Sequence, residues 1–93
     1  MYIFREHRGS LDEAMMTAKE FSNLDDLLEH IVKVNTIFNG VPAFSREDIS
    51  FGNDVINDTR IGWEDTRRVC VKRYYNELYP IPQCIGWVAT KYK

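Results

Sequence analysis

Basic and aromatic side chains concentrate in residues 63–74, where their chemistry suits the binding of an anion. Guanidinium groups bind phosphates through paired hydrogen bonds, and aromatic rings stack on nucleobases. A strand would nevertheless place these cations on both of its faces, and edge strands carry Lys and Arg simply to prevent aggregation. The segment therefore predicts either a ligand-binding face or an ordinary sheet edge. The candidate ligand-binding residues in it are Trp63, Arg67, Arg68, Lys72, Arg73 and Tyr74.

A second candidate anion site precedes Gly9 and Ser10. Ser10 and Glu13 have the spacing of a capping box, which predicts a short helix over 11–16. The free N–H groups at a helix start favour an anion, and nearby basic side chains would reinforce them. Capped helix starts after charged turns are common, so the pattern has low specificity for phosphate. The residues that it adds to the candidate ligand-binding set are Arg5, His7 and Arg8.

The two cysteines, Cys70 and Cys84, are interpreted as small buried hydrophobic side chains with free thiols. Neither lies in a Cys-x-x-Cys pair, so a zinc site would have to gather both cysteines and both histidines, His7 and His30, from across the chain. If their segments pair as neighbouring strands, a disulfide would need Cα atoms within about 7 Å. A disulfide and a reactive thiol beside the neighbouring cations both stay open.

Four carboxylates between residues 54 and 65 do not have the spacing of a calcium loop. They are Asp54, Asp58, Glu64 and Asp65. A solvated loop is the favoured interpretation, because Asn57 and Asp58 are typical turn residues. The sequence also has no glycine-rich nucleotide loop, no zinc-protease motif and no nucleophile elbow. We therefore predict no catalytic residue, no metal ligand and no cofactor.

Hydrophobic spacing predicts the elements of the first half of the chain. Residues 2–4 favour a strand, and residues 17–21 are ambiguous between a continued helix and an extended link. A longer helix is predicted at about 23–37, with Ser22 as its cap and Asp25 and Asp26 in its first turn. Its expected buried stripe consists of Leu24, Leu27, Leu28, Ile31 and either Val32 or Val34.

The second half changes to the period of strands. Short strands are predicted near 49–51 and 55–56, and longer ones over 66–74 and 84–90. Residues 75–83 contain Pro80 and Pro82 and are expected to form a rigid loop. Trp63 and Trp87 are expected to anchor the core. The predicted fold is α+β, with two helices packed on one face of a mostly antiparallel sheet of four to five strands.

Composition places these elements in one domain over residues 1–93. The 93 residues are 44% hydrophobic and 28% charged, a balance that excludes a disordered chain. We expect no membrane span and no signal peptide, and two cysteines favour a reducing cytoplasm. The net charge of −2 hides an asymmetry, because residues 60–93 hold seven basic and three acidic residues. This asymmetry indicates either an acidic helix opposite a basic sheet or a basic face for an anionic ligand.

Five segments together carry a resemblance over nearly the whole chain, weakest over 35–58. They are residues 2–5 (YIFR), 7–11 (HRGSL) with Ala14 and Met15, 60–63 (RIGW), 69–73 (VCVKR) and 82–86 (PQCIG). In these segments the chain resembles small proteins encoded by phages and prophages of gut Firmicutes. The resemblance implies expression in the cytoplasm of a bacterial host. It brings no assigned active site, so no catalytic residue is carried over.

The resemblance implies a non-enzymatic phage accessory protein that acts against host defence by binding. The first hypothesis is an oligomeric sponge that sequesters a nucleotide-like immune signal, because a small domain has little room for an internal pocket and a homo-oligomer would build one at its interfaces. The second is an anti-CRISPR-like inhibitor that binds a host defence protein through the acidic surface of residues 12–29. A nucleic-acid-binding regulator is a third hypothesis, disfavoured by the negative net charge. An enzyme is the fourth and would need Cys70, Cys84 or His7 as its reactive group.

Overall fold

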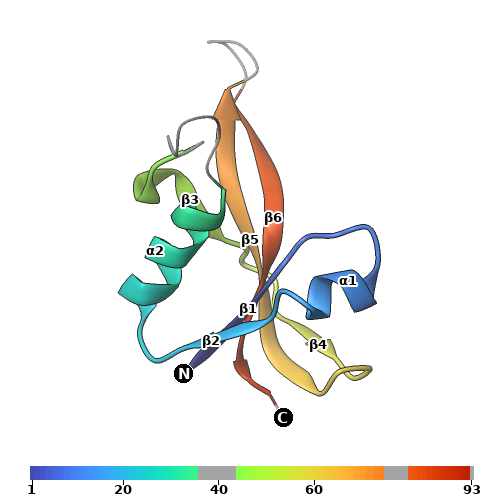
Figure 1. The fold of residues 1–93 in the computed structure, drawn as a ribbon. Coiled ribbons are helices and arrows are strands. Elements are labelled where there is room, and N and C mark those ends of the chain that lie inside the picture. Colours follow the sequence, from blue (N-terminus) through green and yellow to red (C-terminus); the bar gives the residue numbers. More distant parts are fainter. Residues whose placement is uncertain (36–43, 75–79, 93) are drawn as a thin grey trace.

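The long hairpin of β5 (Trp63–Tyr74) and β6 (Pro80–Lys91) forms the centre of the sheet. The computed structural model describes residues 1–35, 44–74 and 80–92, with side chains described over 1–35, 44–71 and 83–92 (Figure 1). β1 (Tyr2–Glu6) pairs with β6, and β2 (Lys19–Phe21) pairs with β1. β3 (Ile49–Phe51) and β4 (Ile56–Asp58) both pair with β5. The strand order is β2-β1-β6-β5-β3, and every pairing is antiparallel.

The predicted α+β class and the mostly antiparallel sheet are confirmed, but the described residues form a sheet of six strands rather than four or five. The additional strand is β2, in the segment that the sequence left ambiguous. It pairs with β1 through Cα partners that include Tyr2 with Phe21. Phe21 is buried in the core, and this long-range packing explains why the segment is extended rather than helical.

Both helices begin at polar caps. α1 (Leu11–Met15) follows Ser10, whose Oγ accepts a hydrogen bond of 3.2 Å from the backbone N–H of Glu13, as predicted. α2 (Leu24–Val34) is capped by Asn23 rather than Ser22, because the Asn23 Oδ1 accepts the N–H of Asp26 at 2.9 Å. The helix ends at Val34, and the predicted positions 36 and 37 lie outside the described residues.

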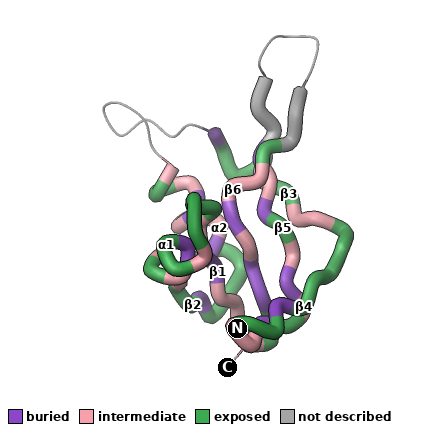
Figure 2. The backbone as a smooth tube through the Cα atoms, turned by 90° about the vertical axis from the view of Figure 1, so that its right-hand side faces the viewer, coloured by how far each residue is buried: buried purple, intermediate pink, exposed green. Residues whose placement is uncertain are grey.

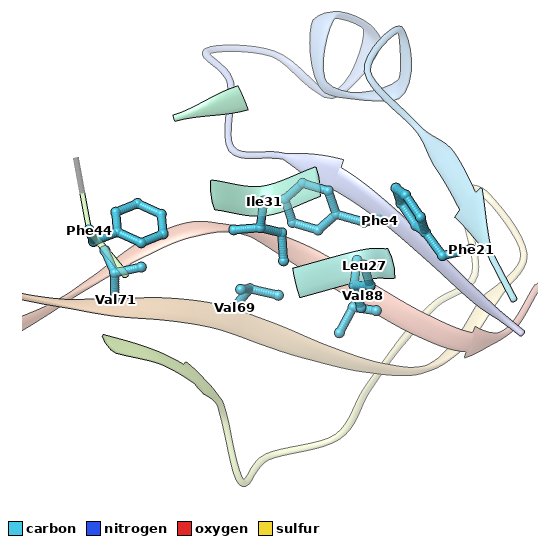
Figure 3. Packing of buried hydrophobic residues seen from close by; sticks show 8 residues of the cluster. All are labelled: Phe4, Phe21, Leu27, Ile31, Phe44, Val69, Val71 and Val88. Carbon is cyan, nitrogen blue, oxygen red and sulfur yellow. The ribbon is translucent and has the colours of Figure 1, made fainter. Parts of the chain in front are cut away.

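The hydrophobic core lies between α2 and one face of the sheet (Figure 3). Leu27 and Ile31 of α2 are fully buried, which confirms the centre of the predicted stripe. Leu24 and Val34 at the helix ends are instead 42% and 41% exposed, and each borders an open cavity between the helix and the sheet. The buried cluster comprises Phe4, Phe21, Leu27, Ile31, Phe44, Val69, Val71 and Val88.

The sheet has a second packed face, which we call the Arg5 face. Phe4 and Arg5 are successive residues of β1 and therefore point to opposite faces. Both are buried, and Figure 2 shows other buried positions on β5 and β6. α2 supplies the helical side chains of the core on the Phe4 side, whereas α1 contacts the Arg5 side chain through the Met15 sulfur at 4.0 Å. The sequence predicted both helices on one face of the sheet. α2 packs on the Phe4 side, whereas α1 contacts Arg5 on the other side of β1.

Gly86 allows β1 and β6 to pack this closely. A Cβ atom at this position would lie 2.5 Å from Cε2 of Phe4 and 2.3 Å from the carbonyl oxygen of Arg5. Both distances are far below van der Waals contact, so any larger residue would displace β1. The absence of a side chain at Gly86 thus leaves room for the Phe4 ring and for the backbone of β1 at Arg5.

The predicted loop over 75–83 is wrong for its last four residues, which begin β6. Residues 75–79 lie outside the described residues. In the register of the hairpin, Pro82 is the partner of Lys72 and Pro80 is the partner of Tyr74. Two prolines normally argue against a strand, so their positions in the ladder need a physical reason.

That reason is the direction of the backbone. The N–H of Gly52 donates to the carbonyl of Arg68 at 2.7 Å, so Arg68 turns its backbone polar groups toward β3. Every second residue of β5 after Arg68 does the same, and these are the residues opposite Pro82 and Pro80. The two proline nitrogens therefore point away from β5, where the missing N–H removes no hydrogen bond from the hairpin.

Candidate anion-binding site

A buried arginine organises the Arg5 face. The Arg5 residue is only 6% exposed, and its guanidinium carbon lies 4.7 Å from the centre of the Trp63 ring and 5.9 Å from that of Trp87. Its Nη2 is 3.6 Å from Oδ2 of Asp58. Burial lowers the pKa of Arg5, while the Asp58 carboxylate opposes that shift. The two indole rings and the carboxylate replace part of the hydration that this cation loses.

Asp58 joins Arg5 to a second, accessible arginine. The Asp58 carboxylate accepts hydrogen bonds from Nε and Nη2 of Arg60 at 3.1 and 3.0 Å, and from the backbone N–H of Arg60 at 3.2 Å. These bonds hold the pKa of Asp58 below its ordinary value, against the effect of burial. The Arg60 side chain is 70% exposed, so the cluster presents a positive group to solvent. The predicted solvated loop is therefore wrong at Asp58, which is buried by this pairing.

A cavity of about 280 Å³ opens beside the cluster. One wall comes from the chain between β1 and α1, which holds Arg8, and the other comes from Arg60 and Trp87. The Arg8 side chain is half exposed and pairs with Glu6 at 2.8 Å. The lining residues are Arg5, Glu6, His7, Arg8, Gly9, Ser10, Leu11, Ala14, Arg60 and Trp87.

Backbone contacts fix the wall between β1 and α1. The Thr17 hydroxyl accepts the N–H of Glu6 at 2.8 Å and donates to the carbonyl of Ala14 at 2.6 Å. It thereby ties the end of β1 to the end of α1. The N–H of His7 donates to the carbonyl of Ile85 at 2.9 Å, which continues the pairing with β6 just past β1. The chain between β1 and α1 is thus held at its start by β6 and at both ends by Thr17.

The half-buried Trp87 stands between two guanidinium groups. In the sheet register Arg5 is opposite Trp87, and Trp87 is opposite Arg68. The guanidinium carbon of the exposed Arg68 lies 5.6 Å from the centre of the Trp87 ring. This row crosses three neighbouring strands and extends the positive surface from the cavity toward β5.

The structure brings together five of the predicted ligand-binding residues. Arg5, His7 and Arg8 line the cavity, Trp63 packs against Arg5, and Arg68 reaches Trp87. Lys72, Arg73 and Tyr74 belong to β5, and their side chains lie outside the described residues.

Arg67 does not belong to this site. Its side chain is on the opposite face from Arg68, where Nη1 donates to the carbonyls of Gly52 and Asn53 at 3.0 and 3.2 Å. It lines a separate cavity of about 350 Å³ with Tyr2, Phe51 and other residues. The two-residue alternation of the strand separates the adjacent arginines, so a single groove containing both is excluded.

Sequence reasoning missed Arg60 and the pairing role of Asp58. Arg60 follows Asp58 by two residues in a turn, a spacing that allows a side-chain hydrogen bond but is common in solvated loops. Trp87 was assigned to the core, whereas it is only half-buried and lines the cavity. The available signal for Trp87 was its alternation with Ile85 and Ala89 in a strand next to basic residues.

Cys70 and Cys84 lie on neighbouring strands, as considered from the sequence, and are Cα partners. Both are free and half-buried, so they are less enclosed than the core positions that were predicted for them. In the described part of the chain, no group of three or more His, Cys, Asp or Glu side chains is arranged to hold a metal ion.

No family model, no curated protein and no solved structure matches this chain. Within residues 1–35, 44–74 and 80–92, no helix is long and apolar enough to cross a membrane.

Proposed function

We propose that this chain binds a nucleotide-like anion at the cavity between Arg8 and Arg60. The supporting observation is the charge and ring arrangement around Trp87. Three guanidinium groups there pair with two carboxylates, and a fourth lies over the half-buried indole of Trp87. The guanidinium groups of Arg8 and Arg60 suit a phosphate, and the indole of Trp87 suits a base. The other charged groups counted are Arg5, Arg68, Glu6 and Asp58.

Cavity size supports a role for a second copy of the chain. About 280 Å³ is near the lower limit of small-molecule pockets, so a single chain would enclose only part of a larger nucleotide. A homo-oligomer that apposes two such cavities would cover the rest of the ligand. Together with the resemblance to phage proteins, this supports a non-enzymatic sponge that sequesters a nucleotide-type immune signal in the bacterial host cytoplasm.

The test measures the equilibrium binding of three phosphate-containing ligands by isothermal titration calorimetry. The ligands are a cyclic mononucleotide, a cyclic dinucleotide and ADP-ribose. Adenosine, which lacks phosphate, serves as the uncharged control. We expect Arg8→Ala and Arg60→Ala each to weaken binding about tenfold, the loss of one charge-assisted hydrogen bond. Arg46→Ala is the matched control, because Arg46 is an exposed arginine that pairs with Asp25 at 2.7 Å, away from the cavity.

Two results would contradict the proposal. One is that none of the three phosphates binds more tightly than adenosine. The other is that Arg46→Ala weakens binding as much as the two cavity variants do. Native mass spectrometry of protein purified from bacterial cells separately reports the number of subunits and any co-purified ligand, and a bare monomer would remove the oligomeric part of the proposal.

The acidic surface of α2 supports the second candidate function, inhibition of a host defence nuclease. Asp25, Asp26 and Glu29 are exposed on this helix. A surface of this charge could cover a basic nucleic-acid channel. Asp25→Lys combined with Asp26→Lys should abolish capture of such a nuclease while leaving nucleotide binding unchanged. Capture that survives this charge reversal would exclude α2 as the binding surface.

A further inference from the structure

The two cysteines face each other across the central hairpin. Cys70 of β5 and Cys84 of β6 are Cα partners, and both thiols are free and half-buried. Partner residues of an antiparallel pair project their side chains from the same face of the sheet. The thiols therefore start as neighbours, with partial access for a small reagent.

The kind of pairing brings these cysteines closer still. Because the backbone of Arg68 is turned toward β3, that of Cys70 two residues later is turned the same way. Cys70 and Cys84 are therefore a non-hydrogen-bonded pair, the type with the shorter Cα separation of about 4.5 Å. A disulfide needs Cα atoms about 4.4–6.8 Å apart, so this class of position can be bridged.

We propose that Cys70 and Cys84 form a redox-active dithiol that closes into an intramolecular disulfide by exchange with a low-molecular-mass disulfide such as oxidised glutathione. The proposal is independent of ligand binding at the cavity. In the first step one cysteine thiolate attacks a glutathione sulfur, the glutathione disulfide bond breaks, and one glutathione thiolate leaves. In the second step the other cysteine thiolate attacks the mixed disulfide and displaces the second glutathione. Two protein thiols are oxidised, and their protons pass to two glutathione thiolates.

Burial and a backbone contact define the environment of the Cys84 thiol. Burial raises the pKa of the Cys84 thiol, so it ionises less readily, and its sulfur is 3.5 Å from the carbonyl oxygen of Gly86. The register of the hairpin shifts between Val69 and Cys70. The shift lies on the Gly86 side of the cysteine pair, and the pairs from Cys70 with Cys84 to Tyr74 with Pro80 follow one regular register.

The experiment equilibrates the full chain with mixtures of reduced and oxidised glutathione, then traps free thiols and measures intact mass. We expect a monomer that has lost two hydrogen atoms and both reactive thiols. Cys70→Ser and Cys84→Ser are the matched controls, and each should stop at a single glutathione adduct. Circular dichroism establishes that these isosteric variants keep the fold.

A comparison with the unfolded chain tests the register itself and requires no variant. An unfolded chain can also form the disulfide between Cys70 and Cys84. The glutathione equilibrium is therefore measured again in concentrated urea, where the hairpin is absent. We expect closure to be at least tenfold more favourable in the native protein, because the hairpin holds the thiols together. Equal or weaker closure in the native state would overturn the proposal, as would a wild-type chain that keeps two thiols, carries two adducts or links only to a second chain.

Discussion

The guanidinium carbon of Arg5 lies 4.7 Å from the centre of the Trp63 ring, with both residues almost fully removed from solvent. A cation in such a position is stable only while its surroundings compensate for lost hydration. Trp63 supplies the face of an aromatic ring, and Asp58 supplies the opposite charge. The same arginine also borders the cavity, so the packing of the Arg5 face and the charge of the candidate site depend on one side chain.

Replacing Arg5 should therefore destabilise the fold strongly. We expect Arg5→Ala to lower the free energy of unfolding by about 3 kcal/mol, because it leaves a hole against Trp63 and removes one partner of a buried carboxylate. Arg8→Ala is the matched control, since an exposed pair such as Arg8–Glu6 contributes little to stability. Urea denaturation measures both changes. Similar losses in the two variants would show that the buried cation contributes no more than a surface one.

Gly86 gives a second, purely steric prediction. Gly86→Ala should lower the free energy of unfolding by about 2 kcal/mol or more, because its Cβ would overlap the Phe4 ring and the Arg5 carbonyl. Gly9→Ala is the control, as the nearest atom to its added Cβ is Glu13 Oε2 at 3.8 Å. Thermal unfolding of both variants checks the difference. A neutral Gly86→Ala would mean that β1 and β6 are farther apart than described.

The cap of α2 can be tested by adjacent substitutions. Asn23→Ala should lower the free energy of unfolding by about 1 kcal/mol, because the Asn23 side chain accepts the N–H of Asp26. Ser22→Ala should change the stability by less than about 0.5 kcal/mol, as expected for an exposed residue without that bond. Denaturation midpoints of the two variants decide between them. If Ser22→Ala is the more damaging change, the helix begins one residue earlier.

We expect the protein to lose stability in mild acid because of the partly buried side chain of His30. Its ring packs against Phe21, with centroids 4.9 Å apart, and burial lowers its pKa below the ordinary 6.5. Lys19 and Lys33 add to that shift, while Glu6 opposes it. The unfolded chain therefore binds the proton more readily, so the contribution of neutral His30 is complete above about pH 6.5 and is lost as pH falls through the folded pKa.

The measurement for His30 is the urea midpoint at several pH values between 7.5 and 5. We expect the midpoint of the wild type to fall over this range and that of His30→Gln to fall less, because glutamine does not titrate. Identical slopes would show that His30 is equally easy to protonate in the folded and unfolded chains.

Local patterns in the sequence predicted the elements well, because they depend on neighbouring residues. The Ser10 cap, the centre of the α2 stripe and the central parts of both long strands follow from spacing alone, whereas the first four residues of β6 were predicted to be a loop. Interactions between distant segments were harder to predict. The orientation of Pro82 depends on which strand Arg68 faces, and the burial of Asp58 depends on an arginine from β1. Neither relationship leaves a periodic signal in the sequence.

The candidate site was predicted in composition but not in arrangement. Arg5 and Arg8 were identified because they precede a helix cap, and they do line the cavity. Arg67 and Arg68 were both candidates, although a strand was expected to place its cations on both faces. The structure puts Arg67 in a separate cavity and Arg68 beside Trp87 on the opposite face. Arg60 was missed because only the folded chain places it opposite Arg8.

The two prolines of β6 also affect how the chain behaves among its own copies. From Ile85 toward Pro80, no strand within the described residues pairs with the side of β6 that faces away from β5. A strand that paired with this side of β6 would need the backbone N–H groups that point toward it. Pro80 and Pro82 occupy two of these positions and have no N–H group. We therefore expect Pro80 and Pro82 to hinder the addition of another strand at residues 80–84, so their replacement should shorten the lag before aggregation in concentrated solution.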